Sequence, residues 1–411
     1  MLADLVPNKQ KFYASLPVLG GTLDDFDEWM VAQGYRFSTR RLYVERCRVV
    51  DRHLHHRRYS LESLTSVQLR HCFRYFRARA AYIASVVGCL ERFLLSNNKI
   101  VSTAPSTPFD DLLTSYCEYM SEVRGLTPST VDSNSRTIIE FLRYVHRSQD
   151  SFSPAHLRPH HLDRFVRSVS GRFGRASIQH VACALRAFIR FLRLKGYMPA
   201  GPDFVIYKPR IYRGEQLPRT LPWSTVLAFL KSIDQDMGAG RRDYAMFLLI
   251  ATYGLRGCDI AGLKLDDIDW RAGVIHLRQQ KTRSPLELPL TRPVAAALLA
   301  YLRKDRPRTS QRCLFFSAVA PIVPLSRQMV GYAFRHRVRT GSLKIPYKGV
   351  YCLRHSYALH LLRSGIALKT IGDLMGHSTM ESTGVYLRVH LEDLRQIALP
   401  LPAAMSGRMA S

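Results

Sequence analysis

The C-terminal third of the chain holds basic and nucleophilic side chains in a series of short motifs. Cutting a phosphodiester requires a nucleophile, donors or cations that hold the charge on the non-bridging oxygens, and an acid that protonates the leaving oxygen. The side chains that could supply these functions are, in order, Arg256 and Asp259, Lys281 beside Thr282, Tyr351 with Arg354 and His355, and His377 followed nine residues later by Tyr386. These residue types favour phosphoryl-transfer chemistry without a metal.

A metal-dependent reaction would need clustered carboxylates or other ligands at suitable spacing. The obvious carboxylate cluster, at residues 266–269, precedes two expected strands, which is typical of a solvated turn. The densest histidine cluster, at residues 53–56, has no Cys or carboxylate partner at ligand spacing, and the eight cysteines form no Cys-x-x-Cys pair. We therefore expect no metal and no other cofactor, and a reduced cytoplasmic protein.

The composition is strongly basic. The chain has 60 Lys and Arg against 32 Asp and Glu, a formal net charge of +28. Such an excess causes self-repulsion in the folded state, so it indicates a polyanionic partner, either nucleic acid or an anionic membrane surface. The N-terminal residues lack a signal-peptide pattern, and the longest apolar runs, at residues 245–252 and 294–302, are too short to span a bilayer. Nucleic acid is the favoured partner.

The first half of the chain contains one helical pattern twice. Gly34-Tyr35 before Ser38-Thr39 in the first copy corresponds to Gly125-Leu126 before Ser129-Thr130 in the second. Ser or Thr before a long amphipathic run is a helix N-cap signal, and both copies have it at the same point. The pattern predicts an internal duplication, although two unrelated helical bundles could also align this loosely.

Two segments read as connectors between domains. Residues 99–108 are rich in Ser, Thr and Pro, and residues 201–218 are rich in Pro, Tyr and basic side chains. They predict an N-terminal helical domain at residues 1–100, a second helical domain at 106–200 and a C-terminal domain at 215–402.

The C-terminal domain combines helices with a small sheet. Short strands at residues 274–278 and 286–290, on either side of a polar turn, predict an antiparallel hairpin. We expect helices at residues 224–232, 242–253, 293–302, 330–337, 356–364, 368–375, 380–386 and 391–398. The fold class is thus mainly α and multidomain, with two helical units and a mixed α/β, mostly helical C-terminal unit.

Arginine recurs at helical spacing in both helical units, with few acidic residues between. A charge run is usually just a solvated face, but here the runs recur and have too few counter-charges for salt bridges. They favour contact with the phosphate backbone of DNA. The candidate DNA-binding residues are Arg36, Arg40, Arg41, Arg48, Arg52, Arg74, Arg77, Arg186, Arg190 and Arg193.

The region from about residue 218 to 402 resembles the catalytic domain of tyrosine recombinases, which include phage integrases and transposon recombinases. The family motifs are Gly-Leu-Arg with an acidic residue three positions on, a hairpin lysine before threonine, His-x-Leu-Arg-His, and Leu-Gly-His with a tyrosine nine positions on. The matching residues are Arg256 and Asp259, Lys281, Leu353 with Arg354 and His355, and His377 with Tyr386.

The resemblance implies a role for each matched residue. Tyr386 would be the nucleophile that forms a 3′-phosphotyrosine link, so that rejoining needs neither ATP nor metal. The phosphate would be bound by Arg256, Arg354 and His377, and Lys281 would protonate the departing 5′-hydroxyl. Asp259 would support an arginine.

One position departs from the family pattern. Tyr351 stands where the first histidine of His-x-Leu-Arg-His is expected. A phenol can donate to a phosphate oxygen but is a poor base near neutral pH. His355 or His377 would therefore be more suited to act as the general base. Tyr351 is also a second tyrosine that experiment must exclude as nucleophile.

The resemblance extends to the second helical domain, which is similar to the SAM-like core-binding domain of the family. The N-terminal domain would be a further DNA-binding module or a protein-docking module. The implied partners are double-stranded DNA and further copies of the chain in a tetrameric synapse, with or without partner recombinases, at the nucleoid.

The favoured function is a site-specific recombinase or integrase of a mobile element. Two alternatives remain open at this point. A type IB topoisomerase shares the catalytic residues but would relax supercoils without site preference. A non-catalytic DNA-binding accessory protein derived from a recombinase would be consistent with Tyr351.

Overall fold

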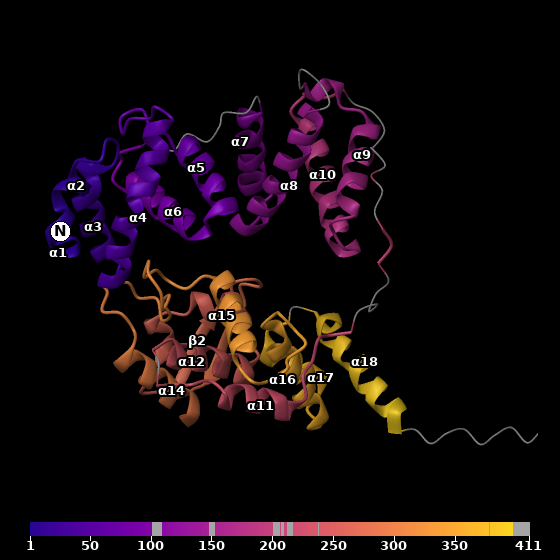
Figure 1. Cartoon of the computed structure of the whole chain (residues 1–411). Helices are drawn as coiled ribbons and strands as arrows, with labels where there is room; N and C mark the ends of the chain where they lie inside the picture. The colour runs from indigo at the N-terminus through magenta and orange to yellow at the C-terminus, as the bar shows by residue number, and fades with distance from the viewer. Residues whose placement is uncertain are drawn as a thin grey trace, which may run out of the picture. The chain divides into compact units, whose positions relative to one another are not determined.

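The computed structural model describes residues 1–100, 109–147, 153–199, 206, 209–211, 217–236, 238–377 and 379–397. Internal contacts divide the chain into two compact units. The first unit comprises Met1–Arg57 and Gln216–Ser411, and the second comprises Arg58–Glu215. Figure 1 labels the elements along the chain. Most of the predicted connectors at 99–108 and 201–218 and the end of the predicted tail fall outside the described residues.

The N-terminal segment of the first unit is helical. Its elements are α1 (Leu2–Leu5), η1 (Pro7–Lys9), α2 (Gln10–Ala14), η2 (Gly20–Thr22), α3 (Leu23–Ala32) and α4 (Phe37–His56). Buried Asp51 of α4 accepts hydrogen bonds from the backbone N–H groups of Val18 and Leu19 over 2.9 and 2.7 Å. This charged acceptor satisfies donors in the turn before α3 that burial would otherwise leave unpaired.

All the secondary structure described in the second unit is helical. Its elements are α5 (Ser66–Arg79), α6 (Ala81–Ser96), α7 (Asp110–Glu118), a π-helical turn η3 (Tyr119–Val123), α8 (Pro128–Arg147), η4 (Pro154–His156), α9 (Pro159–Ser170) and α10 (Arg175–Leu194). Aromatic side chains form much of the core around α10. The ring of Tyr116 meets those of Phe188 and Phe191 edge-on, with centroids 5.2 and 5.4 Å apart.

Each of the two expected copies contains a short helix followed by a long one. Helices α4 and α8 each have 20 residues. Helix α4 follows the 10-residue α3, and α8 follows the 9-residue α7 and its π-helical turn η3. The expected N-caps differ from the structure, because α4 begins at Phe37 and α8 at Pro128. Ser38 and Ser129 therefore lie inside the first turn, where serine is also tolerated, rather than before it.

The C-terminal segment of the first unit contains eight α-helices and the 3-10 helix η5 (Leu265–Asp267) among its described residues. The α-helices are α11 (Trp223–Lys231), α12 (Gly238–Tyr253), α13 (Gly257–Gly262), α14 (Arg292–Lys304), α15 (Arg327–Thr340), α16 (Tyr351–Arg363), α17 (Leu368–Met375) and α18 (Met380–Ile397). Phe229, Phe247 and Phe334 meet in its core with centroids 5.3 to 5.9 Å apart. Helix α18 continues through the separate helix expected at 391–398, because no Gly or Pro interrupts it after Tyr386.

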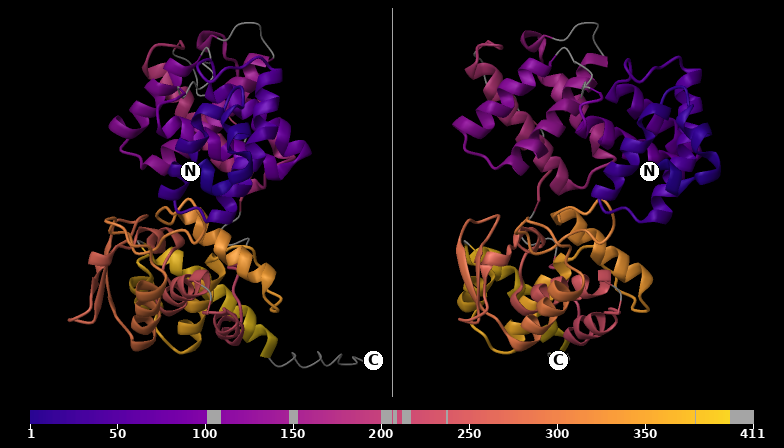
Figure 2. Two further views of the ribbon diagram at one scale, coloured as in Figure 1. Left: turned by 60° about the vertical axis from the view of Figure 1, so that its left-hand side comes forward. Right: turned by 90° about the vertical axis from the view of Figure 1, so that its left-hand side faces the viewer.

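A three-stranded antiparallel sheet lies at one side of helices α11 to α18 (Figure 2). Strand β2 (Val274–Arg278) pairs with β3 (Pro285–Pro289) as the expected hairpin, and with a short β1 (Ile268–Asp269) that the sequence did not reveal. Strand β2 alternates between buried Ile275 and Leu277 and exposed neighbours. The mostly helical fold class with a small antiparallel sheet is confirmed.

None of the helices in the described residues has the length and apolar character that crossing a bilayer requires.

Candidate active site

Two arginine side chains lie buried close together at the starts of two helices. Arg256 is the N-cap of α13 and is 8% exposed, and Arg354, in the first turn of α16, is 3% exposed. Burial, followed by the charge of Arg256, lowers the pKa of Arg354 to about 10. A guanidinium remains charged at neutral pH. Two such charges held together away from water form a strong site for an anion.

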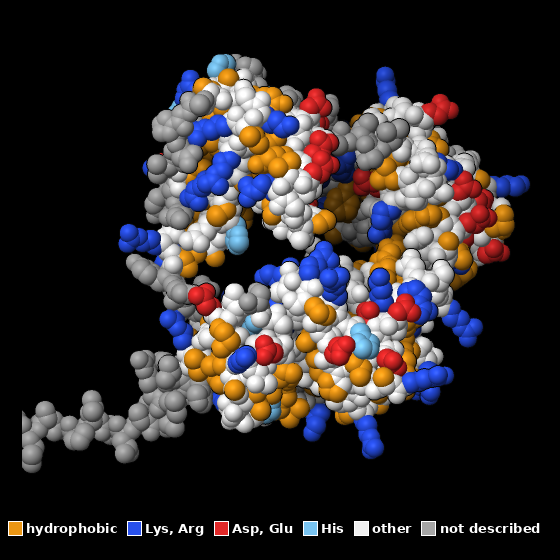
Figure 3. Space-filling model, turned by 180° about the vertical axis from the view of Figure 1, so that it is seen from behind, with side chains coloured by type: hydrophobic (Ala, Val, Ile, Leu, Met, Phe, Trp, Pro, Cys, Tyr) orange, Lys and Arg blue, Asp and Glu red, His pale blue; other side chains and the backbone are white. Residues whose placement is uncertain are grey.

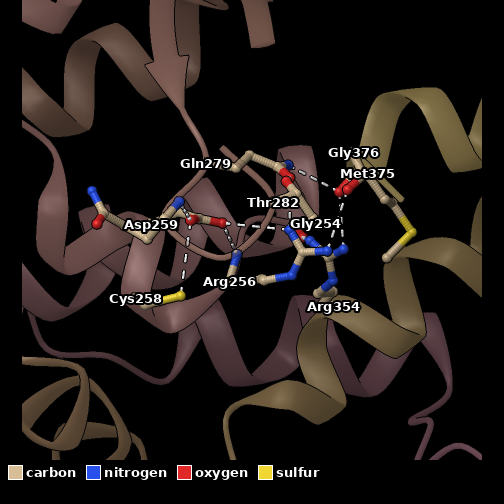
Figure 4. A network of polar contacts seen from close by, with 10 residues as sticks. Gly254, Arg256, Cys258, Asp259, Gln279, Thr282, Arg354, Met375 and Gly376 are labelled. Carbon is tan, nitrogen blue, oxygen red and sulfur yellow. Dashed lines mark hydrogen bonds and ion pairs between the residues drawn. The ribbon is translucent and has the colours of Figure 1, made fainter. Parts of the chain in front are cut away.

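Backbone carbonyl groups hold both guanidinium groups in place (Figure 4). Arg354 donates from Nη1 to the carbonyl of Gly254, and from Nη2 to that of Met375 over 2.9 Å. Arg256 donates from Nη2 to the carbonyl of Gly376 over 3.3 Å. Gly254 and Gly376 have φ angles of +63° and +60°. Glycine adopts this left-handed backbone without strain, and the resulting turns direct the carbonyl groups toward the arginines.

Asp259 connects the first arginine to the hairpin. Its carboxylate is fully buried, and Oδ2 accepts from the backbone N–H of Arg256 over 3.2 Å and lies 4.0 Å from Nη1 of the same residue. Oδ1 accepts from the backbone N–H of Gln280 over 2.9 Å. Asp259 therefore supports both the helix start that carries Arg256 and the hairpin turn that carries Lys281.

Gln279 also belongs to this cluster, and sequence reasoning missed it. Its side chain is fully buried, and its Oε1 accepts from Arg256 Nη1 and from Thr282 Oγ1, each over 2.7 Å. Its Nε2 donates to the carbonyl of Met375 over 3.0 Å. The signal was available, because Gln279 continues the alternation of buried Ile275 and Leu277. An uncharged polar residue on the apolar face of a strand indicates a polar partner in the interior.

Tyr386 lies on α18 with its ring 2% exposed. Its hydroxyl is 2.8 Å from Nδ1 of His355, in the second turn of α16. Burial raises the pKa of Tyr386 to about 12, against an opposing effect of Arg354 and Arg256. Burial and the charge of Arg354 lower the pKa of His355 to about 4. At neutral pH the imidazole is therefore uncharged and able to accept the phenolic proton.

His377 directly follows the glycine that ends α17. Its Nδ1 is 2.8 Å from Oγ1 of Thr383, a fully buried residue of α18 that sequence reasoning also missed. Burial, followed by the charges of Arg354 and Arg256, lowers the pKa of His377 to about 4. When Thr383 donates to Nδ1, the imidazole proton is on Nε2, which can then donate to an anion.

Two of the expected site residues lie at the edge of this cluster or beyond it. Tyr351, at the start of α16, is 37% exposed, and its ring centroid is 6.1 Å from that of His355. Lys281 is exposed in the turn between β2 and β3, and its side chain makes none of the contacts described above. The structure thus brings together Arg256, Asp259, Arg354, His355, His377 and Tyr386, with Tyr351 beside them.

The candidate DNA-binding arginines lie on helices, or next to them, in both units. Arg36, Arg41, Arg48, Arg52, Arg74, Arg77 and Arg190 are exposed, whereas Arg40, Arg186 and Arg193 are half-buried. Arg40 donates to buried Asp27 over 2.8 Å, and Arg186 donates to the carbonyl of Ile206 over 3.1 Å. On the face shown in Figure 3, Lys and Arg side chains recur over both units, with smaller acidic patches among them.

The carboxylates at residues 266–269 make local contacts. Asp266 pairs with Arg312, and Asp269 accepts from the backbone N–H groups of Arg271 and Ala272 over 2.9 and 2.8 Å. Among the described residues, no group of three or more His, Cys, Asp and Glu side chains is arranged to hold a metal ion.

Comparisons with known proteins found two matching family models. Residues 221–392 match the phage integrase family, and residues 113–196 match the N-terminal SAM-like domain of phage integrases. A putative integrase/recombinase, y4rA, of Sinorhizobium fredii is 30% identical over 387 residues, which cover 92% of this chain and 93% of the relative. Tyrosine recombinase XerD of Listeria innocua is 26% identical over 285 residues, which cover 68% of this chain and 94% of XerD.

Solved structures show the same fold. The XerH site-specific recombinase bound to its palindromic difH substrate has a TM-score of 0.54 at 18% identity, and covers 79% of this chain and 92% of its own. The Tn1549 transposon integrase in complex with a circular intermediate DNA has a TM-score of 0.51 at 16% identity, with coverages of 69% and 99%. From the near full-length relative, the two family models and this shared fold, we conclude that the chain belongs to the phage integrase family of tyrosine recombinases.

Proposed function

We propose that this protein is a site-specific DNA recombinase of a mobile element, which cuts and rejoins DNA through a 3′-phosphotyrosine intermediate. The observation that carries the proposal is the 2.8 Å contact between the Tyr386 hydroxyl and a neutral His355, beside two buried arginines. A nucleophile, a base and an anion site occur together there. This is the minimum set for metal-free attack on a phosphodiester.

In the proposed cleavage step, the scissile phosphate binds between Arg256 and Arg354. Its non-bridging oxygens accept hydrogen bonds from further guanidinium N–H groups, while the backbone carbonyls keep both side chains in place. His377 donates a further hydrogen bond from Nε2. These donors stabilise the charge that develops on the phosphate as the nucleophile attacks, which is a large contribution to phosphoryl-transfer rates.

Proton transfers accompany the attack. His355 accepts the phenolic proton as the Tyr386 oxygen bonds to phosphorus, and the bond from phosphorus to the 5′-oxygen breaks. Lys281 protonates the departing 5′-oxygen, and its exposed place on the hairpin turn makes it accessible to DNA. Rejoining reverses these steps, because a 5′-hydroxyl of the partner strand attacks the phosphotyrosine and Tyr386 leaves. One phosphoester bond replaces another throughout, so the proposed reaction uses neither ATP nor metal.

The relatives support a mobile-element substrate. The S. fredii relative is named a putative integrase/recombinase, and two solved structures are of a site-specific recombinase and a transposon integrase with DNA. We propose that residues 106–200 and 215–402 each bind double-stranded DNA, that residues 1–100 add a further DNA-binding or docking domain, and that the chain acts at the nucleoid in the cytoplasm. A tetrameric synapse, with or without partner recombinases, would pair two sites.

A nicked suicide substrate built from the DNA that flanks the gene tests this function. The nick lets the short strand end diffuse away, so cleavage leaves a covalent adduct visible on a denaturing gel. We expect an adduct with the wild type and with Tyr351→Phe, and none with Tyr386→Phe. An adduct that survives in Tyr386→Phe and disappears in Tyr351→Phe would reassign the nucleophile.

Two other results would overturn the proposed function. Relaxation of supercoiled DNA without site preference would indicate a type IB topoisomerase. Tight binding of the flanking DNA without any adduct would indicate a non-catalytic accessory protein.

A further inference from the structure

Gln279 is a fully buried polar residue in contact with Arg256. We propose that Gln279 is a positioning residue for phosphate binding. Its neutral amide orients the guanidinium of Arg256 and connects it to the backbone that carries His377. The proposal rests on the recombinase function above and deepens it, because it concerns the same phosphate site.

The amide connects three separate segments of the chain. Its Oε1 accepts from Arg256 at the start of α13 and from Thr282 in the hairpin turn, both over 2.7 Å. Its Nε2 donates over 3.0 Å to the carbonyl of Met375, the last residue of α17. That same carbonyl accepts from Arg354 Nη2 over 2.9 Å. One carbonyl and one amide therefore join both buried arginines and the backbone before His377 in a single network.

Packing fixes the amide in this orientation. A Cβ atom placed on Gly376 would lie 2.2 to 2.4 Å from the amide atoms of Gln279, closer than any real contact. The amide thus lies directly against the glycine backbone and is fully buried. A rotation that exchanged Oε1 and Nε2 would direct a donor at the Arg256 guanidinium and an acceptor at the Met375 carbonyl. Both hydrogen bonds would be lost in the interior, so a single orientation is stabilised.

The proposal requires that the side chain at position 279 be uncharged. A carboxylate of the same shape would still accept from Arg256, but it would neutralise the charge that must attract the phosphate. It would also direct an oxygen at the Met375 carbonyl, where a donor is needed. Glutamine orients the arginine with a dipole and leaves the full positive charge for the substrate.

The test compares Gln279→Glu with Gln280→Glu in the full-length protein. Gln280 is the next residue, its side chain is exposed, and only its backbone N–H takes part in the network. Both variants add the same negative charge to the same hairpin, so general repulsion of DNA is matched. We expect adduct formation on the suicide substrate to slow roughly 10- to 100-fold in Gln279→Glu, the range for a perturbed charge-assisted hydrogen bond, and to stay within about threefold in the control.

A neutral substrate separates positioning from simple structural damage. When a methyl group replaces one non-bridging oxygen of the scissile phosphate, the phosphate loses its negative charge and depends less on Arg256. We expect the deficit of Gln279→Glu relative to wild type to shrink to within about threefold on this substrate, since the electrostatic contribution is what the variant removes. An equal deficit on both substrates would mean a merely structural role and would overturn the proposal.

Further variants keep the proposal testable if Gln279→Glu does not fold. Gln279→Met keeps the size and zero charge but loses the hydrogen bonds, and Thr282→Val removes one donor to Oε1. We expect both to slow cleavage, with Thr282→Val the milder, and the DNA Kd to change little because few of the DNA contacts are altered. Full activity in both would overturn the proposal while the recombinase function stands. If the wild type binds the flanking DNA but forms no adduct, the recombinase function itself fails and the positioning proposal fails with it.

Discussion

Arginine occurs in two different settings in this molecule. Arg256 and Arg354 are buried, and each donates to backbone carbonyls that fix its guanidinium group. Arg77 and Arg190 are exposed on α5 and α10. The buried pair is ordered before any phosphate arrives, so little reorganisation accompanies binding. The exposed arginines would be ordered only by the DNA, and each could be replaced by a neighbour.

This difference teaches what each setting can contribute. A preorganised buried charge acts strongly on a single phosphate, because neither water nor salt screens it fully. Exposed charges act weakly and additively along the DNA backbone, and salt weakens them. We therefore expect the buried arginines to determine cleavage and the exposed ones to determine affinity.

The largest effect is expected for Arg354→Ala. The variant removes a donor from the developing charge on the phosphate, and we expect adduct formation to slow about 10²- to 10³-fold. The free energy of unfolding should also fall by about 1–3 kcal/mol, because the buried carbonyl of Gly254 loses its donor. Arg190→Ala is the matched control, with unfolding changed by no more than about 0.5 kcal/mol. Adduct kinetics and urea unfolding measure both effects. Equal effects in the two variants would show that buried and exposed arginines do not differ in their contribution to cleavage.

The next effect concerns the glycine beside the buried pair. Gly376 and Gly125 have almost the same φ, +60° and +59°, but only at Gly376 would a Cβ meet another side chain. We expect Gly125→Ala to destabilise by about 1–2 kcal/mol from backbone strain alone. Gly376→Ala should destabilise by more, because the amide of Gln279 must move. Thermal unfolding of the two variants measures the difference, and equal shifts in Tm would show that the site accommodates the extra carbon.

A smaller effect is expected at the exposed arginines. Arg77→Ala and Arg190→Ala should each weaken DNA binding several-fold and lower the slope of log Kd against log salt by about one. The rate of the covalent step at saturating DNA should be unchanged. Titrations at several salt concentrations give the slope. A lower rate at saturation with an unchanged slope would place these arginines in the reaction rather than in binding.

The smallest effect is expected from pH near neutrality. Burial lowers the pKa of His355 and His377 to about 4, from an ordinary value of 6.5. Because both histidines stay uncharged in this range, we expect kcat/KM for cleavage to be constant between about pH 5.5 and 7. It should fall as the pH approaches 4 and the histidines become protonated. A decline centred on pH 6.5 would indicate that His355 is solvated like an ordinary surface histidine.

The same pKa values affect stability with a definite sign. Between about pH 4 and 6.5 an imidazole of the unfolded chain binds a proton that the folded protein excludes. The free energy of unfolding should therefore fall as pH drops through that range. Above pH 6.5 these two histidines should not change the free energy of unfolding further. Urea unfolding at several pH values measures this dependence.

The sequence could predict the site where the chemistry depends on residue type and spacing along the chain. Arg256, Arg354, His377 and Tyr386 were named as candidates in this way and lie together in the structure, and the hairpin and helix α17 lie where the sequence predicted them. Gln279 and Thr383 were missed, because their partners at Met375 and His377 are distant or depend on how helices pack. The helices expected at 380–386 and 391–398 belong to one helix, α18, because residues 387–397 contain neither Gly nor Pro.

The seclusion of the Tyr386 hydroxyl bears on the integrity of the DNA that such an enzyme handles. A phosphotyrosine ester that water could reach would be hydrolysed, and the chromosome would be left with a broken strand that no partner end could reseal. Tyr386, the proposed nucleophile, is only 2% exposed, and its hydroxyl lies 2.8 Å from Nδ1 of His355. We expect such a buried position to favour a 5′-hydroxyl delivered with the DNA over the far more abundant water.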